Sequence, residues 1–331
     1  MAVGIHPDII VARCDEELPL EIRKKISLFC NVGEDCVINN TTCKSLYEVP
    51  LMLHAQNMDD VVCRDLGLES AKDYNALADW SKMVETIHAR QGELTVALVG
   101  KYVKLHDSYL SIVESLNHAS FVIGKNIKIK WVDSDSVTDE TAPEVFGDVS
   151  GIILPGGFGH RGVEGMICAC RYARTHKMPY FGICLGMQIA VIEFARSVLG
   201  FKDANSREFD ETCEHAVIDL MKDQQGVIMG GTMRLGSYPC NVKAGTTLEK
   251  AYGASLINER HRHRYEFNND YREQMQQAGL TISGTSPDGE LVEAVEVEEQ
   301  FHVGVQFHPE FKSRPNAAGP LFVEFLRACQ K

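Results

Sequence analysis

Short apolar segments alternate with helical segments over residues 94–199, and this alternation constrains the fold more than any other feature. The expected strands lie at 94–100, 126–132, 149–154 and 179–183. The expected helices lie at 107–122, 163–176 and 185–199, the first of them capped by Asp107 and Ser108. Because parallel strands need helical crossovers, this order predicts an α/β fold with a doubly wound, mostly parallel sheet covered on both faces.

The regions on either side of this series have a different texture. Residues 226–307 carry short strand and turn signals, with a last strand expected at 303–307 and a C-terminal helix from Pro320. The polar, helix-prone stretch before residue 93 is typical of a connector. We therefore expect three parts: an N-terminal piece at 1–57, a helical linker at 58–92 and the α/β domain at 93–331.

Composition and charge narrow the class of protein. The chain has 331 residues and a net charge of −13, which suits neither duplex DNA nor an anionic membrane. The apolar runs are too short to cross a bilayer, and the first residues do not have the pattern of a signal peptide. Eleven cysteines in a chain without a signal peptide are typical of reduced thiols, so we expect a cytoplasmic protein. From the charge and the short apolar runs we expect no nucleic-acid or membrane partner.

The segment Gly182-Ile183-Cys184-Leu185-Gly186 is the sharpest local feature. An apolar strand runs directly into a helix, with a nucleophilic residue at the junction and glycine two positions away on each side, as in a nucleophile elbow. The helix N-terminus favours the thiolate form of Cys184, and the Leu185 N–H lies where an oxyanion would form. The alternative is a cysteine buried in the core, which is what we expect for the other ten.

A second feature, His308-Pro309-Glu310, directly follows the last expected strand. In extended backbone, residues two apart point to the same side, so His308 and Glu310 can face one site. The imidazole would carry protons for a thiolate, and the carboxylate would orient it. A surface turn is the alternative, and the Cys184 elbow favours the catalytic interpretation.

A glycine-rich segment, Leu154-Pro155-Gly156-Gly157-Phe158-Gly159, follows the third expected strand. Glycine-rich backbone at the carboxyl end of a strand can bring an N–H close to a ligand, and could complete an oxyanion hole with Leu185. The alternative is a phosphate loop. A Walker A loop is excluded because no Lys-Ser or Lys-Thr follows at the required spacing.

These segments, in this order, make the domain at 93–331 resemble the class I, triad-type glutamine amidotransferases. More narrowly, the chain resembles the CTP synthase family. The strings that carry the resemblance are 155–166, 182–188, 205–209, 230–236, 259–266 and 305–310. The resemblance implies a flavodoxin-like sheet for this domain.

The N-terminal piece resembles the end of the family's synthetase (amidoligase) domain, on residues 4–13 and 25–32. We therefore expect 1–57 to be a remnant of an α/β synthetase domain. In the family a long ATP- and UTP-binding portion with a phosphate loop comes first, and this sequence contains no such loop. We expect the chain to be a fragment whose synthetase half is a missing partner.

The resemblance implies a role for each matching residue of the Cys184 site. Cys184 would attack the side-chain amide of glutamine and form a glutamyl thioester, with His308 as the acid and base and Glu310 as its orienting partner. Gly157 and Leu185 N–H groups would hold the oxyanion. The residues implied to line the glutamine pocket are Gly157, Leu185, Gly186, Met187 and Gln188.

The resemblance also implies a charged pair for the amino-acid end of glutamine. Glu208 would bind the α-ammonium and Arg264 the α-carboxylate, which a planar guanidinium suits. The alternatives are a surface glutamate and a solvated basic strand at 260–264. His261 and His263 have no accompanying cysteine or carboxylate ligand set, so we expect no metal in this domain.

Nucleotide contacts are implied at two places. Phe158 and Arg161 resemble the family's lid for GTP, an allosteric activator, although His160 stands where the family often has an aromatic residue. Lys25 resembles a residue that binds a nucleotide triphosphate, and Arg13 lies nearby in the sequence. Ordinary surface cations are the alternative for Lys25 and Arg13.

The complete family enzyme would make CTP from UTP, ATP and L-glutamine as a homotetramer, with Mg²⁺ bound by the synthetase domain and no cofactor in the glutaminase domain. We therefore expect a glutamine-hydrolysing ligase half in pyrimidine nucleotide biosynthesis. Two alternatives stay open. One is a free-standing glutaminase or the amidotransferase subunit of another ligase, and the other is a non-catalytic assembly or regulatory fragment.

Overall fold

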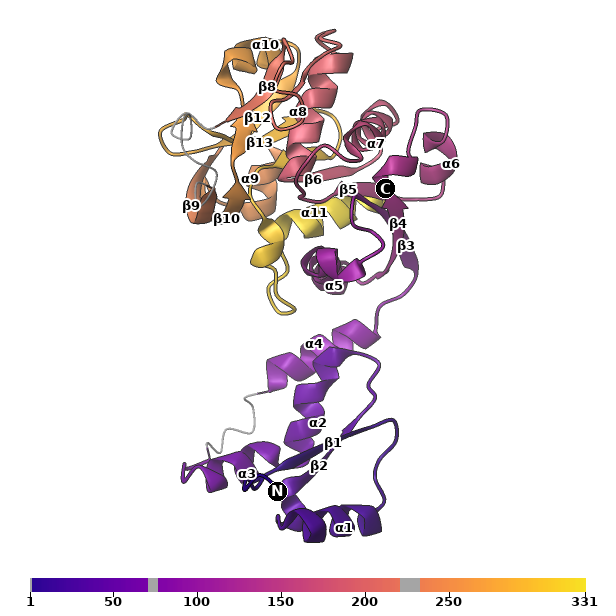
Figure 1. The fold of residues 1–331 in the computed structure, drawn as a ribbon, viewed down its shortest axis with the longest axis vertical. Coiled ribbons are helices and arrows are strands. Elements are labelled where there is room, and N and C mark those ends of the chain that lie inside the picture. Colours follow the sequence, from indigo (N-terminus) through magenta and orange to yellow (C-terminus); the bar gives the residue numbers. More distant parts are fainter. Residues whose placement is uncertain (1, 71–76, 221–232) are drawn as a thin grey trace. The chain divides into compact units, whose positions relative to one another are not determined.

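The computed structural model describes residues 2–70, 77–220 and 233–331, and it divides into two compact units, Met1–Ala89 and Arg90–Lys331 (Figure 1). The division of the sequence into remnant, linker and α/β domain stays a prediction.

The first unit is a small α/β unit. Its strands β1 (Ile10–Cys14) and β2 (Val37–Thr41) pair in parallel, joined by the crossover helix α1 (Leu20–Cys30). Its other α-helices are α2 (Val49–Ala55), α3 (Met58–Asp65) and α4 (Ala78–His88). Residues 71–76 of the predicted helical linker lie outside the described residues. Leu28 and Phe29 are largely exposed on α1.

The second unit is built on a nine-stranded sheet with the order β10-β9-β12-β13-β14-β6-β5-β3-β4. Its parallel strands are β3 (Glu93–Gly100), β4 (Asn126–Asp133), β5 (Gly151–Leu154), β6 (Tyr180–Ile183) and β14 (His302–Val305). Numbered along the chain, these five strands have the order 2-1-3-4-5, which is the flavodoxin-like order. The structure therefore confirms the predicted doubly wound α/β fold.

The other half of the sheet is antiparallel, so the whole sheet is mixed. Its strands are β9 (Arg234–Val242), β10 (Leu256–His263), β12 (Leu280–Thr285) and β13 (Val292–Val297). A separate small sheet holds β7 (Asn205–Ser206), β8 (Ala216–Leu220) and β11 (Tyr265–Phe267). Residues 226–232 of the predicted short strands and turns lie outside the described residues.

Helices cover both faces of the parallel strands, as the apolar runs predict. The covering helices are α5 (Leu110–Ile123) and α11 (Pro320–Cys329), which contact each other, and α7 (Val163–Thr175) and α8 (Leu185–Ser197), which also contact each other. Alternate residues of β3 pack into two different core clusters. Val96 and Leu98 pack with α5 and α11 on one face of the sheet. Ala97 and Val99 pack with α7 and α8 on the other face. Both faces are buried, and this explains why β3 is apolar at every inner position.

Shorter helices complete the second unit: α6 (Ala142–Phe146), α9 (Thr247–Tyr252) and α10 (Arg272–Gln277). None of the helices in the described part of the chain is long and apolar enough to cross a membrane.

The predicted Asp107–Ser108 cap is wrong. These residues lie in a 3₁₀ turn, His106–Tyr109, and α5 begins at Leu110 with Tyr109 at its N-cap and no side-chain cap. The Tyr109 hydroxyl accepts hydrogen bonds from the N–H groups of Lys101 (3.0 Å) and Tyr102 (3.2 Å). These tertiary contacts link the turn to the residues that follow β3. They position the start of α5, where the sequence predicted a local cap.

We expect Gly182→Ala to lower the free energy of unfolding of the second unit by about 3 kcal/mol, the upper end of typical overpacking costs. A Cβ at Gly182 would lie 2.6 Å from the carbonyl carbon of Gly186, which is helix backbone and cannot move aside. Urea denaturation measures the loss. The control is Gly124→Ala, where a Cβ meets nothing and only the positive φ of 70° costs about 1 kcal/mol. Equal losses in the two variants would contradict the close approach.

Candidate active site

The candidate site lies at the carboxyl ends of the parallel strands, beside the point where the strand order reverses between β3 and β5. Lys101 follows β3, Gly156 and Gly157 follow β5, and Cys184 follows β6. A cavity of about 350 Å³ opens here. Its lining includes Gly156, Gly157, Cys184, Arg262, His308 and Glu310. The fold thus brings the predicted Cys184, His308 and Glu310 to one cavity.

Cys184 occupies a strained turn between β6 and α8. Its φ of 52° and ψ of −99° are unusual for a residue with a side chain, and such strain persists only where the surroundings enforce it. The enforcing contacts are backbone ones: the Cys184 N–H donates to Val305 O (2.7 Å), and Gly182 packs against Gly186. Helix α8 begins at Leu185, so the N–H groups of its first turn, next to Cys184, lack intrahelical partners.

His308 is held on both sides. Its Nδ1 lies 2.7 Å from Glu310 Oε1, and its backbone N–H donates to Arg260 O (2.7 Å) on β10. A Cβ built on Gly156 would lie 2.9 Å from His308 Cε1 and 3.6 Å from Cys184 Cβ, so both side chains border the same small space. The other ring nitrogen, Nε2, is buried without a hydrogen-bond partner in the described part of the chain.

Electrostatics favour a protonated His308. Burial by itself lowers the pKa of His308, but the negative charge of the Cys184 sulfur and the Glu310 carboxylate outweigh burial and raise the pKa to about 10. An imidazolium beside a thiolate is the resting state of a cysteine nucleophile. Glu310 can hold that imidazolium in place through Nδ1.

Gly157 and Leu185, the two predicted oxyanion donors, are neighbours. A Cβ on Gly157 would lie 3.2 Å from Leu185 Cδ2 and 3.8 Å from Lys101 Cδ. Lys101, which the sequence reasoning missed, buttresses this glycine-rich segment. The side chain of Lys101 is buried, and its Nζ donates to the carbonyl oxygens of Phe158 (3.2 Å) and Gly159.

Burial lowers the pKa of Lys101 to about 8, against the opposing influence of Glu208. A sequence signal for Lys101 does exist. Lys101 directly follows a buried strand, at the point where the strand order reverses, and ligands of α/β sheets bind at such points.

Glu208 and Arg264, predicted to bind the two ends of an amino acid, gather near Tyr265. Glu208 Oε1 accepts the Gly159 N–H (2.8 Å) and is half-buried, which excludes a plain surface glutamate. Burial raises the pKa of Tyr265, the charges of Glu208, Glu211 and Asp219 raise it further, and Arg264 lowers it. Glu208 and Arg264 are not among the residues that line the cavity around Cys184.

The predicted pocket residues Gly186, Met187 and Gln188 lie in the first turn of α8 and are buried. Gln188 Nε2 donates to Tyr265 O (3.0 Å) and to Gln306 Oε1 (3.2 Å). Gln306, a second residue missed by the sequence reasoning, places its own Nε2 3.5 Å from Cys184 Sγ. The signal that could have found it was its place directly after the last strand, two residues before His308.

The residues predicted to contact nucleotides are spread over both units. Phe158 is exposed beside the cavity, with the Arg262 guanidinium 5.9 Å above its ring, and Arg161 pairs with Asp135 (2.8 Å). In the first unit, Arg13 donates to Thr42 Oγ1 (2.9 Å) and Lys25 is exposed.

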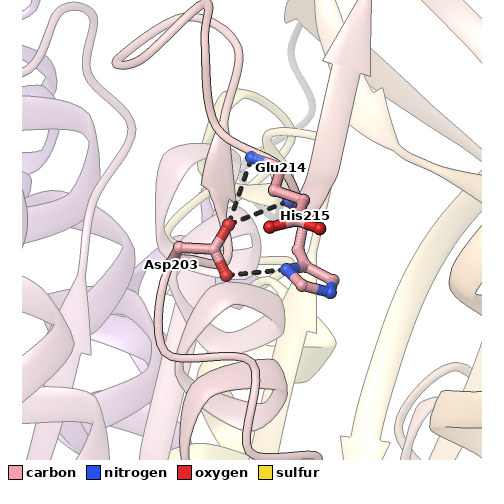
Figure 2. A group of neighbouring side chains, drawn as sticks. All are labelled: Asp203, Glu214 and His215. Carbon is pink, nitrogen blue, oxygen red and sulfur yellow. Dashed lines mark hydrogen bonds and ion pairs between the residues drawn. The ribbon is translucent and has the colours of Figure 1, made fainter.

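One group of side chains in the described ranges has the spacing of metal ligands: Asp203, Glu214 and His215, with ligand atoms within 4.8 Å of one another (Figure 2). Asp203 Oδ2 accepts the backbone N–H groups of Glu214 and His215 (3.1 Å each), and Asp203 Oδ1 lies 2.6 Å from His215 Nδ1. These hydrogen bonds account for the grouping as a loop contact.

The two histidines considered as metal ligands in the sequence, His261 and His263, lie next to each other. His261 Nδ1 is 3.1 Å from His263 Nε2.

Comparison with known proteins identifies the family. Residues 104–328 match the family described as glutamine amidotransferase class-I, and residues 1–68 match CTP synthase N-terminus. The chain belongs to the class I glutamine amidotransferase family. The second match shows that the resemblance to CTP synthase extends to the N-terminal piece.

Curated relatives and one solved structure agree with this family. The chain is 52% identical to the CTP synthase of Clostridium acetobutylicum over 330 residues, covering 99% of this chain and 61% of the relative. It is 50% identical to a Staphylococcus aureus (strain JH9) CTP synthase, covering 99% of this chain and 62% of the relative. The chain therefore spans about three fifths of the length of these relatives.

The solved structure is the glutaminase domain of Trypanosoma brucei CTPS with bound acivicin. It has a TM-score of 0.68 and 38% identity to this chain, and the match covers 72% of this chain and 94% of that domain. The structural match confirms the class I amidotransferase fold.

We expect His308 to titrate near pH 10 in the folded protein, and at a clearly lower pH in Cys184→Ala, because the sulfur charge is the leading cause that raises its pKa. NMR of the His308 Cε1 proton measures both midpoints. His302, whose pKa burial lowers to about 3, is the internal control and should stay neutral throughout.

The raised pKa has a consequence for stability. Protonated His308 stabilises the fold fully below the unfolded pKa of about 6.5, and this contribution is lost as pH rises through about 10.

If the NMR titration gives the same His308 midpoint in the wild-type protein and in Cys184→Ala, that result would contradict the thiolate–imidazolium pair.

Proposed function

We propose that the unit Arg90–Lys331 hydrolyses L-glutamine through Cys184, His308 and Glu310 and supplies ammonia for the ATP-dependent amination of UTP to CTP. The observation that carries the proposal is the strained Cys184 turn beside the His308–Glu310 pair, at one cavity. A cysteine, a proton carrier and an orienting carboxylate are the parts that a thioester mechanism needs.

In the first half of the reaction, the Cys184 thiolate attacks the side-chain amide carbon of glutamine. The negative charge moves to the amide oxygen, where the N–H groups of Gly157 and Leu185 stabilise it. As the carbon–nitrogen bond breaks, His308 gives its proton to the leaving nitrogen. Ammonia departs, and a glutamyl thioester remains on Cys184.

In the second half, the now neutral His308 accepts a proton from water as the water attacks the thioester carbon. The carbon–sulfur bond breaks, glutamate leaves, and Cys184 returns as a thiolate beside the imidazolium. Glu310 holds the ring through Nδ1 during both halves, so that Nε2 faces the reacting atoms.

The amino-acid end of glutamine would be bound by opposite charges. We assign the α-ammonium to Glu208 and the α-carboxylate to Arg264, supported by their shared neighbour Tyr265. Gly186 and Met187 are buried in the first turn of α8, so their share in the glutamine pocket would come from backbone atoms. Gln188 lies in the same turn and completes the set of pocket residues.

The activity of the whole relatives is part of the proposal, because the chain spans about three fifths of their length. UTP, ATP and Mg²⁺ would bind with the remainder of the synthetase portion, near Lys25 and Arg13 of the first unit. GTP would act as an activator near Phe158 and Arg161, and the complete enzyme would be a cytoplasmic homotetramer. The exposed apolar side chains of Leu28 and Phe29 support a covering partner for the first unit.

We expect the purified chain to release glutamate from L-glutamine, and Cys184→Ala to abolish the release while leaving the fold intact. The coupled glutamate assay, run with and without GTP, measures the rate. Adding the synthetase portion of a relative tests whether that portion or GTP raises the rate. Cys240→Ala, which changes a core cysteine, is the matched control. Glutamate release that persists in Cys184→Ala would contradict the assigned nucleophile, and no release under any condition would favour a regulatory fragment.

Acivicin should form a covalent adduct at Cys184, since the Trypanosoma brucei domain of the same fold has acivicin bound. Mass spectrometry of a proteolytic digest locates the adduct. The other ten cysteines serve as internal controls, because burial raises the pKa of several of them, including Cys170, Cys240 and Cys329. Labelling spread evenly over the cysteines would count against an activated thiolate.

A further inference from the structure

We propose that Gln306 is a catalytic residue whose side-chain N–H donates to the Cys184 thiolate, and that Gln188 is the positioning residue that orients it. The role of this contact in glutamine hydrolysis rests on the function proposed above. The contact itself stands on the geometry of three buried side chains, Cys184, Gln188 and Gln306.

Gln306 directly follows β14, in the bend that leads to His308. Its backbone N–H donates to Glu293 O (2.8 Å), which ties the bend to β13. Gln306 and His308 both lie beside Cys184: Gln306 Nε2 is 3.5 Å from Sγ, and a Cβ on Gly156 would lie close to both His308 and Cys184. Only 1% of Gln306 is exposed, so its carboxamide must find its partners inside the protein.

The orientation of the Gln306 carboxamide follows from its neighbours. The Gln188 amide faces a backbone carbonyl, Tyr265 O, at 3.0 Å, and only an NH₂ group can donate to that oxygen. The same NH₂ group lies 3.2 Å from Gln306, so the oxygen of Gln306 must face it. The remaining end of Gln306 is its NH₂ group, which then points to Cys184 Sγ at 3.5 Å.

Besides His308, the sulfur contacts Arg262 O and Gln306 Nε2, which suit different protonation states. Arg262 O lies 3.9 Å from Sγ and can only accept, so it pairs with the thiol. Gln306 Nε2 can only donate, so it pairs with the thiolate. A hydrogen bond to a charged acceptor is stronger than one to a neutral acceptor, and the Gln306 contact therefore favours ionised Cys184.

The Gln306 contact would act at two points of the cycle. Gln306 stabilises the thiolate before it attacks, and again when the thioester breaks and the sulfur leaves with its charge. In the thioester the sulfur is neutral, and the hydrogen bond is weak. Gln188 does not contact Cys184 Sγ in this scheme, and its effect on the sulfur passes through Gln306.

Other groups near Cys184 also influence its ionisation, and they stay the same in a Gln306 variant. From the loop after β3 these are Tyr102 and Tyr109, and from the segment after β14 they are His308 and Glu310. From β10 it is Arg262, with His261 and His263 on the other face of that strand. His261 and His263 are neutral near pH 7, because burial lowers their pKa values to about 2 and about 3. A difference between variants therefore reports the carboxamide.

The test is the rate of Cys184 alkylation by iodoacetamide between pH 5 and 10, which needs no glutamine. We expect Gln306→Leu to lower the rate at pH 7 by roughly 10-fold and to move the pH midpoint upward, as loss of a hydrogen bond to a charged group predicts. Gln306→Glu keeps the acceptor for Gln188 and presents a carboxylate to the sulfur, so its rate should fall further. Gln188→Leu should give a smaller fall, and Gln276→Leu on the exposed side of α10 should give none.

A purely structural role for Gln306 would leave the pH midpoint unchanged in folded variants, and that result would overturn the proposal. If Gln306→Leu does not fold, Gln306→Glu decides. The wild-type protein gives a further measure, because the ¹⁵N side-chain amide signal of Gln306 should shift when Cys184 is alkylated, and no shift would contradict the contact.

Failure of this inference is distinguishable from failure of the proposed function. Wild-type protein that alkylates as expected but releases no glutamate would contradict the function and leave the Gln306 contact standing. Glutamate release with an unchanged Gln306→Leu alkylation profile would do the opposite.

Discussion

The close approach of two backbone segments at Cys184 is the constraint on which the site depends. Gly182 and Gly186 allow strand β6 and helix α8 to pack with backbone against backbone, and a side chain at Gly182 would overlap the helix. Cys184 is thereby forced to a positive φ, and its sulfur stands at the start of α8. The strain is sustained because β6 is hydrogen-bonded on both sides, by β5 and β14.

The two halves of the sheet divide the work of building the site. The parallel half places Lys101, Gly157, Cys184 and His308 at the site, since all four follow strands whose carboxyl ends meet at one edge. The antiparallel half supplies a wall: the β10 carbonyl of Arg260 holds the His308 N–H, and that of Arg262 contacts the sulfur.

Buried charges and imidazoles support that wall from behind. Arg234 at the start of β9 pairs with Glu293 on β13 at 2.6 Å, and both side chains are almost completely buried. His261 lies between this pair and His263 on the inner face of β10. A buried pair of this kind costs desolvation, and removing one partner would leave an uncompensated charge, so the network resists movement of the strand.

The sequence by itself determined the parallel α/β core, and it singled out Cys184, His308 and Glu310, which the structure brings to one cavity. The apolar runs that became β3, β5 and β6 and the Gly182–Gly186 elbow carry their information locally, in period and in turn chemistry. It did not predict the start of α5, where a contact from Tyr109 to the end of β3 replaces the expected cap. Such contacts form only when the fold brings the residues together, and no hydrophobic periodicity in the sequence indicates them.

Only the tertiary structure decided which residues support the glycine-rich segment and contact Cys184. Lys101 and Gln306 look like ordinary strand-end residues in the sequence, and they become part of the site because strand order places them beside Phe158 and Cys184. The sequence places Gln188 in the first turn of the helix after Cys184, but only the structure shows that its amide nitrogen donates to Tyr265 and Gln306. The physical reason is that a hydrogen bond between buried groups depends on which segments meet, and that is settled by sheet topology rather than by local sequence.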